Sequence, residues 1–310
     1  MKSSVCWRNT FFSMMILLTL FIMACSSSNS PTPPKAYNEI FVANYYGANV
    51  EVFSRTADGA ATPLRTITGL NMPDNVAVDE VNNELFVYDA GDLVIKVFSR
   101  TADGAATPLR TITGTELDST GDITGLMVDP VNNELFVSGN DSVFVFSRTA
   151  DGAATPLRTI SGFSNIRGLA LDATNSELFV ADLSAGSIYV VSSTTDGVAT
   201  PLRTITGVGG VEGLALDMIN NELIAGATSS GGSVRVYSRT ADGAATPLRT
   251  ITTTVTDDME GVAVDPYSNE LFATSLSGII LVFPRTADGE TTPLRTITGL
   301  PSPAGITLGP

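Results

Sequence analysis

Short apolar runs separated by polar turns recur along most of the chain. In the first complete unit the runs are Asn75–Asp79 (NVAVD), Glu84–Tyr88 (ELFVY), Leu93–Phe98 (LVIKVF) and Leu109–Thr113 (LRTIT). They are short, rich in Val, Ile, Phe and Thr, and show no helical periodicity, which is typical of β-strands. The turns between them contain Asn82-Asn83 and Asp58-Gly59, residue types that tolerate the positive φ of hairpin turns. The pattern therefore predicts four antiparallel strands in each unit.

The unit occurs six times. The segment Ser54–Gly69 (SRTADGAATPLRTITG) returns unchanged as Ser99–Gly114 and with few changes in the other units. Its PLRT motif begins at Pro63, Pro108, Pro156, Pro201, Pro247 and Pro293, at a spacing of 45 to 48 residues. A period of this length indicates a propeller, a solenoid or an array, and four strands in each period favour the propeller.

The phase of the repeat predicts how the ring closes. The repeating part begins at Asn38 with NEIFVAN, which matches the second strand of the unit, and ends with GITLGP from Gly305, which matches the first strand. The last strand would therefore complete the blade that the first residues begin. We predict an all-β fold over residues 38–310: a six-bladed β-propeller with four-stranded antiparallel blades, closed by the C-terminal strand joining the N-terminal blade.

The consensus of the unit resembles a known repeat. It reads G-[VL]-A-[VL]-D-x-x-x-N-E-L-F-V-A, then I-x-V-F, then P-L-R-T-I-x-G. This resembles the NHL repeat and, more broadly, the six-bladed propellers that include YVTN-type and gluconolactonase-like proteins. The likeness covers residues 38–310. Such proteins include binding scaffolds, lactonases and lyases, so the resemblance implies the fold and does not select an activity.

The first residues predict export and an anchor. Lys2 and Arg8 flank an apolar segment of 14 residues, Phe11–Ala24, which is shorter than the roughly 20 residues of a membrane span and is typical of a secretory signal. The segment ends in Ile22-Met23-Ala24-Cys25, which resembles the lipobox of bacterial lipoproteins. The resemblance implies a signal peptide over residues 1–24 and a lipidated Cys25. The alternative is an ordinary signal peptide with an incidental Cys.

A polar tether follows the predicted lipidation site. Residues 25–37 contain the stretch SSSNSPTPPK, whose Ser and Pro residues form no core. The residue after Cys25 is Ser and not Asp, which in lipoproteins of this kind implies the outer membrane. We therefore expect a protein of the bacterial cell envelope that is attached to the membrane through its lipid anchor.

Composition excludes several functions. The formal net charge of −15 disfavours nucleic acid and anionic lipid as partners and permits cationic ones, including metal ions. The chain has no His, which excludes Ser-His-Asp catalysis, imidazole zinc sites and the His-dependent lyases built on related propellers. No phosphate-binding GxxxxGK[ST] loop is present. We assign no catalytic residue.

The charged residues that recur in every unit are expected to be structural. We predict that the Arg of each PLRT motif pairs with a recurrent Glu, and that a recurrent Asp forms turns. The Arg residues are Arg65, Arg110, Arg158, Arg203, Arg249 and Arg295, and the Glu residues are Glu39, Glu84, Glu134, Glu177, Glu222 and Glu270. The Asp residues are Asp58, Asp103, Asp151, Asp196, Asp242 and Asp288.

The loops that vary between units fall on one face of the predicted propeller, where we expect binding. Tyr45 and Tyr46 lie in one such loop, and Asp257 and Asp258 lie in another. These loops are rich in acids, and the one basic residue that we assign to them is Arg167. The alternative interpretation is that the acids solvate the loops and cap turns. A protein or carbohydrate at the cell surface is the expected partner of this face.

Six residues precede the innermost strands at the predicted mouth of the channel: Asp74, Thr124, Arg167, Glu212, Glu260 and Ala304. Asp74, Glu212 and Glu260 form a candidate site for a hard cation such as Ca²⁺, which takes carboxylate oxygens. Glu-Gly at this strand also resembles the metal-binding Glu of gluconolactonase-like propellers. In the competing arrangement, Arg167 pairs with Glu212 and no metal site is left.

Three functions remain open. The first is a non-enzymatic binding or scaffolding propeller on the envelope that uses its variable acidic face. The second is a metal-dependent hydrolase of the lactonase kind, with Asp74, Glu212 and Glu260 on the metal. The third is a structural surface protein without a small ligand. The absence of His and the near-identity of the units favour the first.

Overall fold

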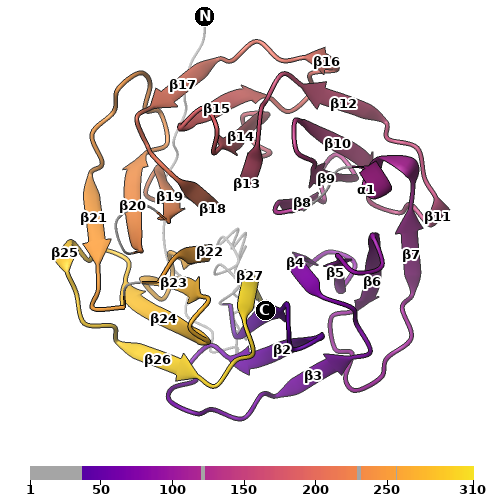
Figure 1. Cartoon of the computed structure of the whole chain (residues 1–310), viewed down its shortest axis with the longest axis horizontal. Coiled ribbons are helices and arrows are strands. Elements are labelled where there is room, and N and C mark those ends of the chain that lie inside the picture. The colour runs from indigo at the N-terminus through magenta and orange to yellow at the C-terminus, as the bar shows by residue number, and fades with distance from the viewer. Residues whose placement is uncertain (1–36, 120–122, 229–231, 256) are drawn as a thin grey trace, which may run out of the picture. The chain divides into compact units, whose positions relative to one another are not determined.

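The computed structural model describes residues 37–119, 123–228, 232–255 and 257–310. The predicted signal peptide, Cys25 and the tether up to residue 36 lie outside these residues. Six β-sheets follow one another around a ring (Figure 1), as the repeat predicts for a six-bladed propeller. None of the helices in the described residues is long and apolar enough to cross a membrane.

Each blade has four main strands, and the blades are numbered around the ring from the one that contains β1. From the first blade to the sixth, the innermost strands are β27 (Pro303–Gly309), β4 (Pro73–Asp79), β8 (Leu126–Asp129), β13 (Ile166–Asp172), β18 (Val211–Asp217) and β22 (Met259–Asp265). The second strands are β1 (Glu39–Asn44), β5 (Glu84–Asp89), β9 (Glu134–Ser138), β14 (Glu177–Asp182), β19 (Glu222–Ala227) and β23 (Glu270–Ser275). The third strands are β2 (Asn49–Ser54), β6 (Val94–Ser99), β10 (Ser142–Ser147), β15 (Ser187–Ser192), β20 (Ser233–Ser238) and β24 (Ile279–Pro284). The outermost strands are β3 (Arg65–Thr68), β7 (Arg110–Thr113), β12 (Arg158–Ser161), β17 (Arg203–Thr206), β21 (Arg249–Thr252) and β26 (Arg295–Thr298).

The predicted closure of the ring is confirmed. The C-terminal strand β27 pairs antiparallel with β1, with Ile40 opposite Leu308 and Glu39 opposite Gly309. The first blade is therefore built from both ends of the described chain. Because β27 lies innermost in that blade, the channel is lined by an unbroken set of six inner strands (Figure 1).

The repeated SRTADGAATP turn joins neighbouring blades. Its Asp was predicted to form the turn, and it also binds the backbone of the blade next to it. Asp103 in the second blade accepts a hydrogen bond from the backbone N–H of Thr66 in β3 of the first blade at 2.9 Å. Gly104 then pairs in parallel with Ile67 of the same strand. In three sheets this pairing makes a short fifth strand, β11 (Gly152–Ala153), β16 (Gly197–Val198) or β25 (Gly289–Glu290). Three of the six blades therefore differ from the four-stranded antiparallel prediction.

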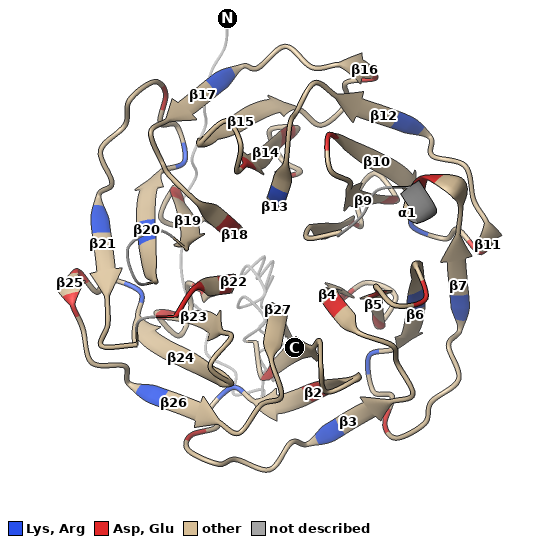
Figure 2. Ribbon diagram, in the orientation of Figure 1, with Lys and Arg blue, Asp and Glu red and all other residues tan. Residues whose placement is uncertain are grey.

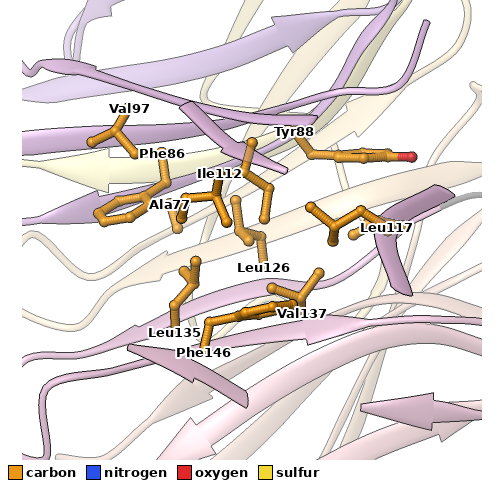
Figure 3. Packing of buried hydrophobic residues seen from close by; sticks show 12 residues of the cluster. Ala77, Phe86, Tyr88, Val97, Ile112, Leu117, Leu126, Leu135, Val137 and Phe146 are labelled. Atoms are coloured by element: carbon orange, nitrogen blue, oxygen red, sulfur yellow. The ribbon is translucent and has the colours of Figure 1, made fainter. Parts of the chain in front are cut away.

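The core lies between adjacent blades. Along β5, Phe86 and Tyr88 point toward the third blade and pack with Leu126, Val137 and Phe146 (Figure 3). The alternate residues of β5, Leu85 and Val87, pack on the other side against the first blade. A strand between two such layers is apolar on both faces, which explains the nearly continuous hydrophobic runs in the sequence.

An ion-pair belt of Arg and Glu side chains surrounds the propeller at one end. Each predicted pair within a blade is present at 2.5 to 2.8 Å: Arg65–Glu39, Arg110–Glu84, Arg158–Glu134, Arg203–Glu177, Arg249–Glu222 and Arg295–Glu270. A second Arg reaches back to an acid of the preceding blade in five places: Arg55–Glu270, Arg100–Glu39, Arg148–Asp79, Arg239–Glu177 and Arg285–Glu222. The belt therefore ties each blade internally and most blades to their neighbours.

The propeller has two faces of different character. The clasp face holds the turns between first and second strands, the SRTADGAATP turns and the ion-pair belt. Its hairpin turns form as predicted, because Asn83 adopts a φ of 56° and the Asp79 carboxylate accepts the N–H groups of Val81 and Asn82. The variable face holds the remaining loops, including the short helix α1 (Thr115–Ser119).

Candidate functional site

The channel runs from the variable face toward the clasp face. A cavity of about 710 Å³ is lined by residues of all six inner strands, and its lining extends from Tyr45 and Tyr46, in the loop after β1, to Tyr37 and Met218 at the clasp-face end. This volume lies within the roughly 300–1,000 Å³ typical of ligand pockets. Figure 2 shows acidic residues at β4, β18 and β22 and a basic residue at β13 on the rim of the channel. The candidate site of the sequence analysis therefore coincides with a cavity.

Local irregularity of the inner strands positions the residues of the mouth. Where β13, β18 and β22 begin, the register with the second strand shifts, between Ile166 and Gly168, between Val211 and Leu214, and between Met259 and Val262. Such bulges re-aim the side chains that they contain. Each shift contains or borders a mouth residue: Arg167, Glu212 or Glu260.

The glycine that follows each of these residues has a packing role. A Cβ added to Gly213 would lie 2.5 Å from the carbonyl oxygen of Glu260, and one added to Gly168 would lie 2.5 Å from the carbonyl oxygen of Glu212. Only glycine therefore allows adjacent inner strands to approach this closely at the mouth. This packing explains the glycine of the Glu-Gly pair, which was noted in the sequence for its resemblance to gluconolactonase-like propellers.

Burial and nearby charge favour the protonated form of the carboxyl groups at the mouth. Burial raises the pKa of Glu260 to about 7, and the nearby carboxylates of Glu212 and Asp258 add to the rise, while Arg167 opposes it. The pKa of Glu212 is also raised, by burial and then by Asp258, against the opposing effect of Arg167. Two carboxylates of adjacent blades thus interact in a half-buried site.

Arg167 neutralises this pair only in part. Its Nε atom lies 3.7 Å from Oε2 of Glu212, which is the competing ion pair of the sequence analysis, and it makes no hydrogen bond there. A loose, partly exposed pair of this kind contributes little, about 0–1 kcal/mol. The site therefore keeps an excess of acidic groups.

The other predicted acidic residues differ in how they relate to the Glu212–Glu260 pair. Asp74 lines the same cavity, but it is not among the charges that shift the pKa of Glu212 or Glu260. Asp258 acts on both glutamates, whereas Asp257 is exposed. Among the residues that the structure describes, no three His, Cys, Asp or Glu side chains form a group that could hold a metal ion.

Tyr45 and Tyr46 form an aromatic wall on the rim of the cavity. Their rings meet edge to face, with centroids 5.1 Å apart and an interplanar angle of 87°. Tyr46 is 80% exposed. An exposed aromatic face can stack on a sugar ring or attract a cation, so the pair extends the site beyond the carboxylates.

Several loop acids on this face are structural, as the alternative interpretation expected. Lys96 on β6 binds Asp89 at 2.5 Å and Asp92 at 2.8 Å. Asp182 accepts backbone hydrogen bonds from Ser164, Asn165 and Ala185. Lys96 was not predicted from the sequence because it lies within a strand, and the signal that could have identified it is its position four residues after Asp92.

Comparisons with known proteins support the fold. No protein-family model matches the chain, and no curated protein matches it. A chain in the crystal structure of a nidogen/laminin complex superposes with a TM-score of 0.65 at 16% identity, covering 87% of this chain and 97% of that one. A functionally unknown protein from Desulfotomaculum acetoxidans DSM 771 superposes with a TM-score of 0.63 at 14% identity, covering 87% and 98%. Identities this low show that the architecture is shared and carry no further assignment.

Proposed function

We propose that the protein is an envelope-anchored, non-enzymatic binding propeller whose variable face holds a positively charged group of its partner at the channel mouth. The observation that carries the proposal is the pair of interacting carboxylates, Glu212 and Glu260, at the opening of the cavity. A similar fold occurs in a chain from a protein–protein complex, that of nidogen and laminin. The partner is a protein or carbohydrate at the cell surface.

The physical basis is competition between a proton and a cation. At pH 8 Glu260 is ionised at a cost, because it is partly buried and lies near the charges of Glu212 and Asp258. Burial and Asp258 also raise the pKa of Glu212, so its ionised form is disfavoured too. A ligand cation that sits between them relieves this repulsion. The Tyr45–Tyr46 wall adds a surface on which an alkyl-ammonium group or a sugar ring can rest.

Ca²⁺ is one candidate cation, and its site would be formed by Glu212 and Glu260 with Asp74 through water. The lactonase-like alternative requires three carboxylates on one metal ion. Among the described residues, Glu212 acts on Glu260, and no three acidic side chains form a group that could hold a metal ion. Binding without catalysis is therefore the function that this arrangement supports best.

Calorimetric titration with CaCl₂ and, separately, with Nα-acetyl-lysine amide tests the proposal. We expect at least one of the two probes to give a saturable binding event. Glu212→Gln and Glu260→Gln should each weaken it, because either change removes one charge of the pair. Glu80→Gln, an exposed substitution on the clasp face, is the matched control and should leave binding unchanged. Absence of binding by both probes at millimolar concentration would contradict the proposed site.

Anchoring is tested separately. Replacement of Cys25 by Ser removes the thiol that the predicted lipid requires, so we expect the protein to leave the membrane fraction or to stay unprocessed. Metabolic labelling with a radioactive fatty acid should mark the wild type and not the Cys25→Ser chain. Correct cleavage of the variant with full retention in the membrane fraction would show that Cys25 is not the anchor.

A further inference from the structure

Exposed apolar side chains are distributed unequally between the two faces. Among the described residues, fifteen large apolar side chains are exposed. Three of them, Tyr46, Met72 and Leu276, belong to loops of the variable face. Eleven of the others lie in the turns and strand starts of the clasp face, and the last, Val198, pairs with Ser161 at the opposite end of an outermost strand. Single exposed apolar residues are ordinary, whereas many on one side supply apolar surface that a partner can cover.

These residues form two rings on the clasp face. The outer ring consists of the Leu residues of the PLRT motifs, each 53 to 59% exposed at the start of an outermost strand: Leu64, Leu109, Leu157, Leu202, Leu248 and Leu294. The inner ring occupies equivalent positions in the turns between first and second strands: Val81, Val131, Ile219 and Tyr267, which are 47 to 80% exposed. Both rings lie at the end of the strands where the ion-pair belt is found.

The chain enters the propeller on this same face. Glu39, the first residue of β1, lies at the clasp-face end of the first blade, and the N–H of Asn38 bonds the carbonyl oxygen of Gly309 at 2.8 Å. Burial raises the pKa of the Tyr37 hydroxyl, and the charges of Glu80, Asp265 and Tyr267 add to the rise, which places Tyr37 near the turns of the clasp face. Residues 26–36 separate this entry point from Cys25, and a chain of that length spans at most about 40 Å.

We propose that the clasp face docks on the surface of a lipid bilayer, with the two apolar rings in the headgroup region and the variable face directed away from the membrane. The proposal rests on the proposed anchor at Cys25, which would hold this face within reach of the bilayer. The contact is apolar in origin, because the net charge of −15 opposes anionic lipid. The expected surface is therefore a zwitterionic one, such as phosphatidylcholine.

A single-tryptophan experiment tests the docking without relying on cellular lipidation. In residues 25–310 the only Cys is Cys25, and the only Trp of the full chain, Trp7, is absent. This part contains every described strand, including both strands that close the ring. It can be coupled through Cys25 to phosphatidylcholine vesicles that contain a maleimide lipid. Val131→Trp then places a reporter on the clasp face and Tyr46→Trp one on the variable face, and each replaces a side chain that is 80% exposed.

We expect brominated phosphatidylcholine to quench the Val131→Trp emission strongly and to leave the Tyr46→Trp emission unchanged. Adding Val81→Ser and Ile219→Ser to the Val131→Trp chain should reduce the quenching, while the melting temperature reports that the fold is intact. Equal quenching of the two reporters, or quenching of neither, would overturn the proposal. So would a concentration-dependent blue shift of Val131→Trp without lipid, because it would show that a second copy of the chain covers this face. Failure of Cys25 lipidation in cells would overturn only the proposed anchor, since the coupling to these vesicles is chemical.

Discussion

Glu260 shows how a single residue couples the channel mouth to pH. In the unfolded chain its carboxyl ionises near the ordinary value of 4.5, and in the folded protein its pKa is about 7. Between these values the folded state binds more protons than the unfolded state, so the contribution of Glu260 to stability falls as pH rises through this window. Above about pH 7 its contribution is fully unfavourable, and each unit of pKa difference is worth about 1.4 kcal/mol.

Glu260→Gln should therefore raise the melting temperature relative to wild type at pH 8 and have little effect at pH 4.5. The amide keeps the shape of the side chain and removes the charge that burial and Glu212 oppose. The measurement is thermal unfolding of both chains across this pH range. Glu80→Gln, an exposed substitution on the clasp face, should change the melting temperature relative to wild type by the same amount at pH 4.5 and at pH 8. A Glu260→Gln difference that is independent of pH would show that the carboxylate is not perturbed.

At the scale of elements, one seam of the ion-pair belt is incomplete. Ser193 stands in the fourth blade where other blades have Arg55, Arg100, Arg148, Arg239 or Arg285. Its carbonyl oxygen accepts hydrogen bonds from Nε and Nη2 of Arg158, but within the described part of the chain no basic side chain of the fourth blade pairs with the acids of the third. Ser193→Arg should restore that link and raise the free energy of unfolding by up to about 1 kcal/mol.

A double-mutant cycle tests this prediction, with the free energy of unfolding measured by urea or thermal denaturation. The gain from Ser193→Arg should disappear when Glu134 and Asp129, the acids of the third blade, are changed to Gln and Asn. Ser193→Gln is the matched control, since it adds length without charge and should give no gain. A stabilisation that survives removal of both acids would mean that the Arg acts through packing instead.

The strands of the blades could be predicted from the sequence because each is an apolar run bounded by turn residues. Some strand boundaries differ from the prediction because the local backbone is not extended. Leu93, which was expected in a strand, adopts a φ of 55° and belongs to the turn before β6. The fifth strands β11, β16 and β25 could not be predicted, because two-residue parallel pairings between blades leave no apolar pattern. The interacting glutamates were named from alignment of the repeats, whereas their pKa values depend on burial that only the packed ring provides.

At the scale of the whole molecule, the two ends of the repeat form one blade. The inner strand β27 pairs with β1 and also lies against the neighbouring inner strands: a Cβ added to Gly305 would approach the carbonyl oxygen of Asp74, and one added to Gly261 would approach that of Ala304. A second closure joins the first and sixth blades on the outside, where Asp58 accepts the N–H of Thr296 at 3.0 Å. The ring is thus closed by contacts at the channel and by contacts at its outer edge.

Deletion of residues 305–310 should therefore destabilise the entire propeller and not only its first blade. The deletion removes the pairing partner of β1 and exposes Ile40 and Val42, which pack with Ile306 and Leu308 in the core between the sixth and first blades. We expect a loss of several kcal/mol, a large part of the roughly 5–15 kcal/mol by which domains are typically stable. Thermal unfolding provides the measurement, and deletion of the same number of residues from the tether, 26–31, is the control that should leave the melting temperature unchanged. If both deletions leave it unchanged, the outer closure at Asp58 suffices to hold the ring, and β27 is not the element that closes it.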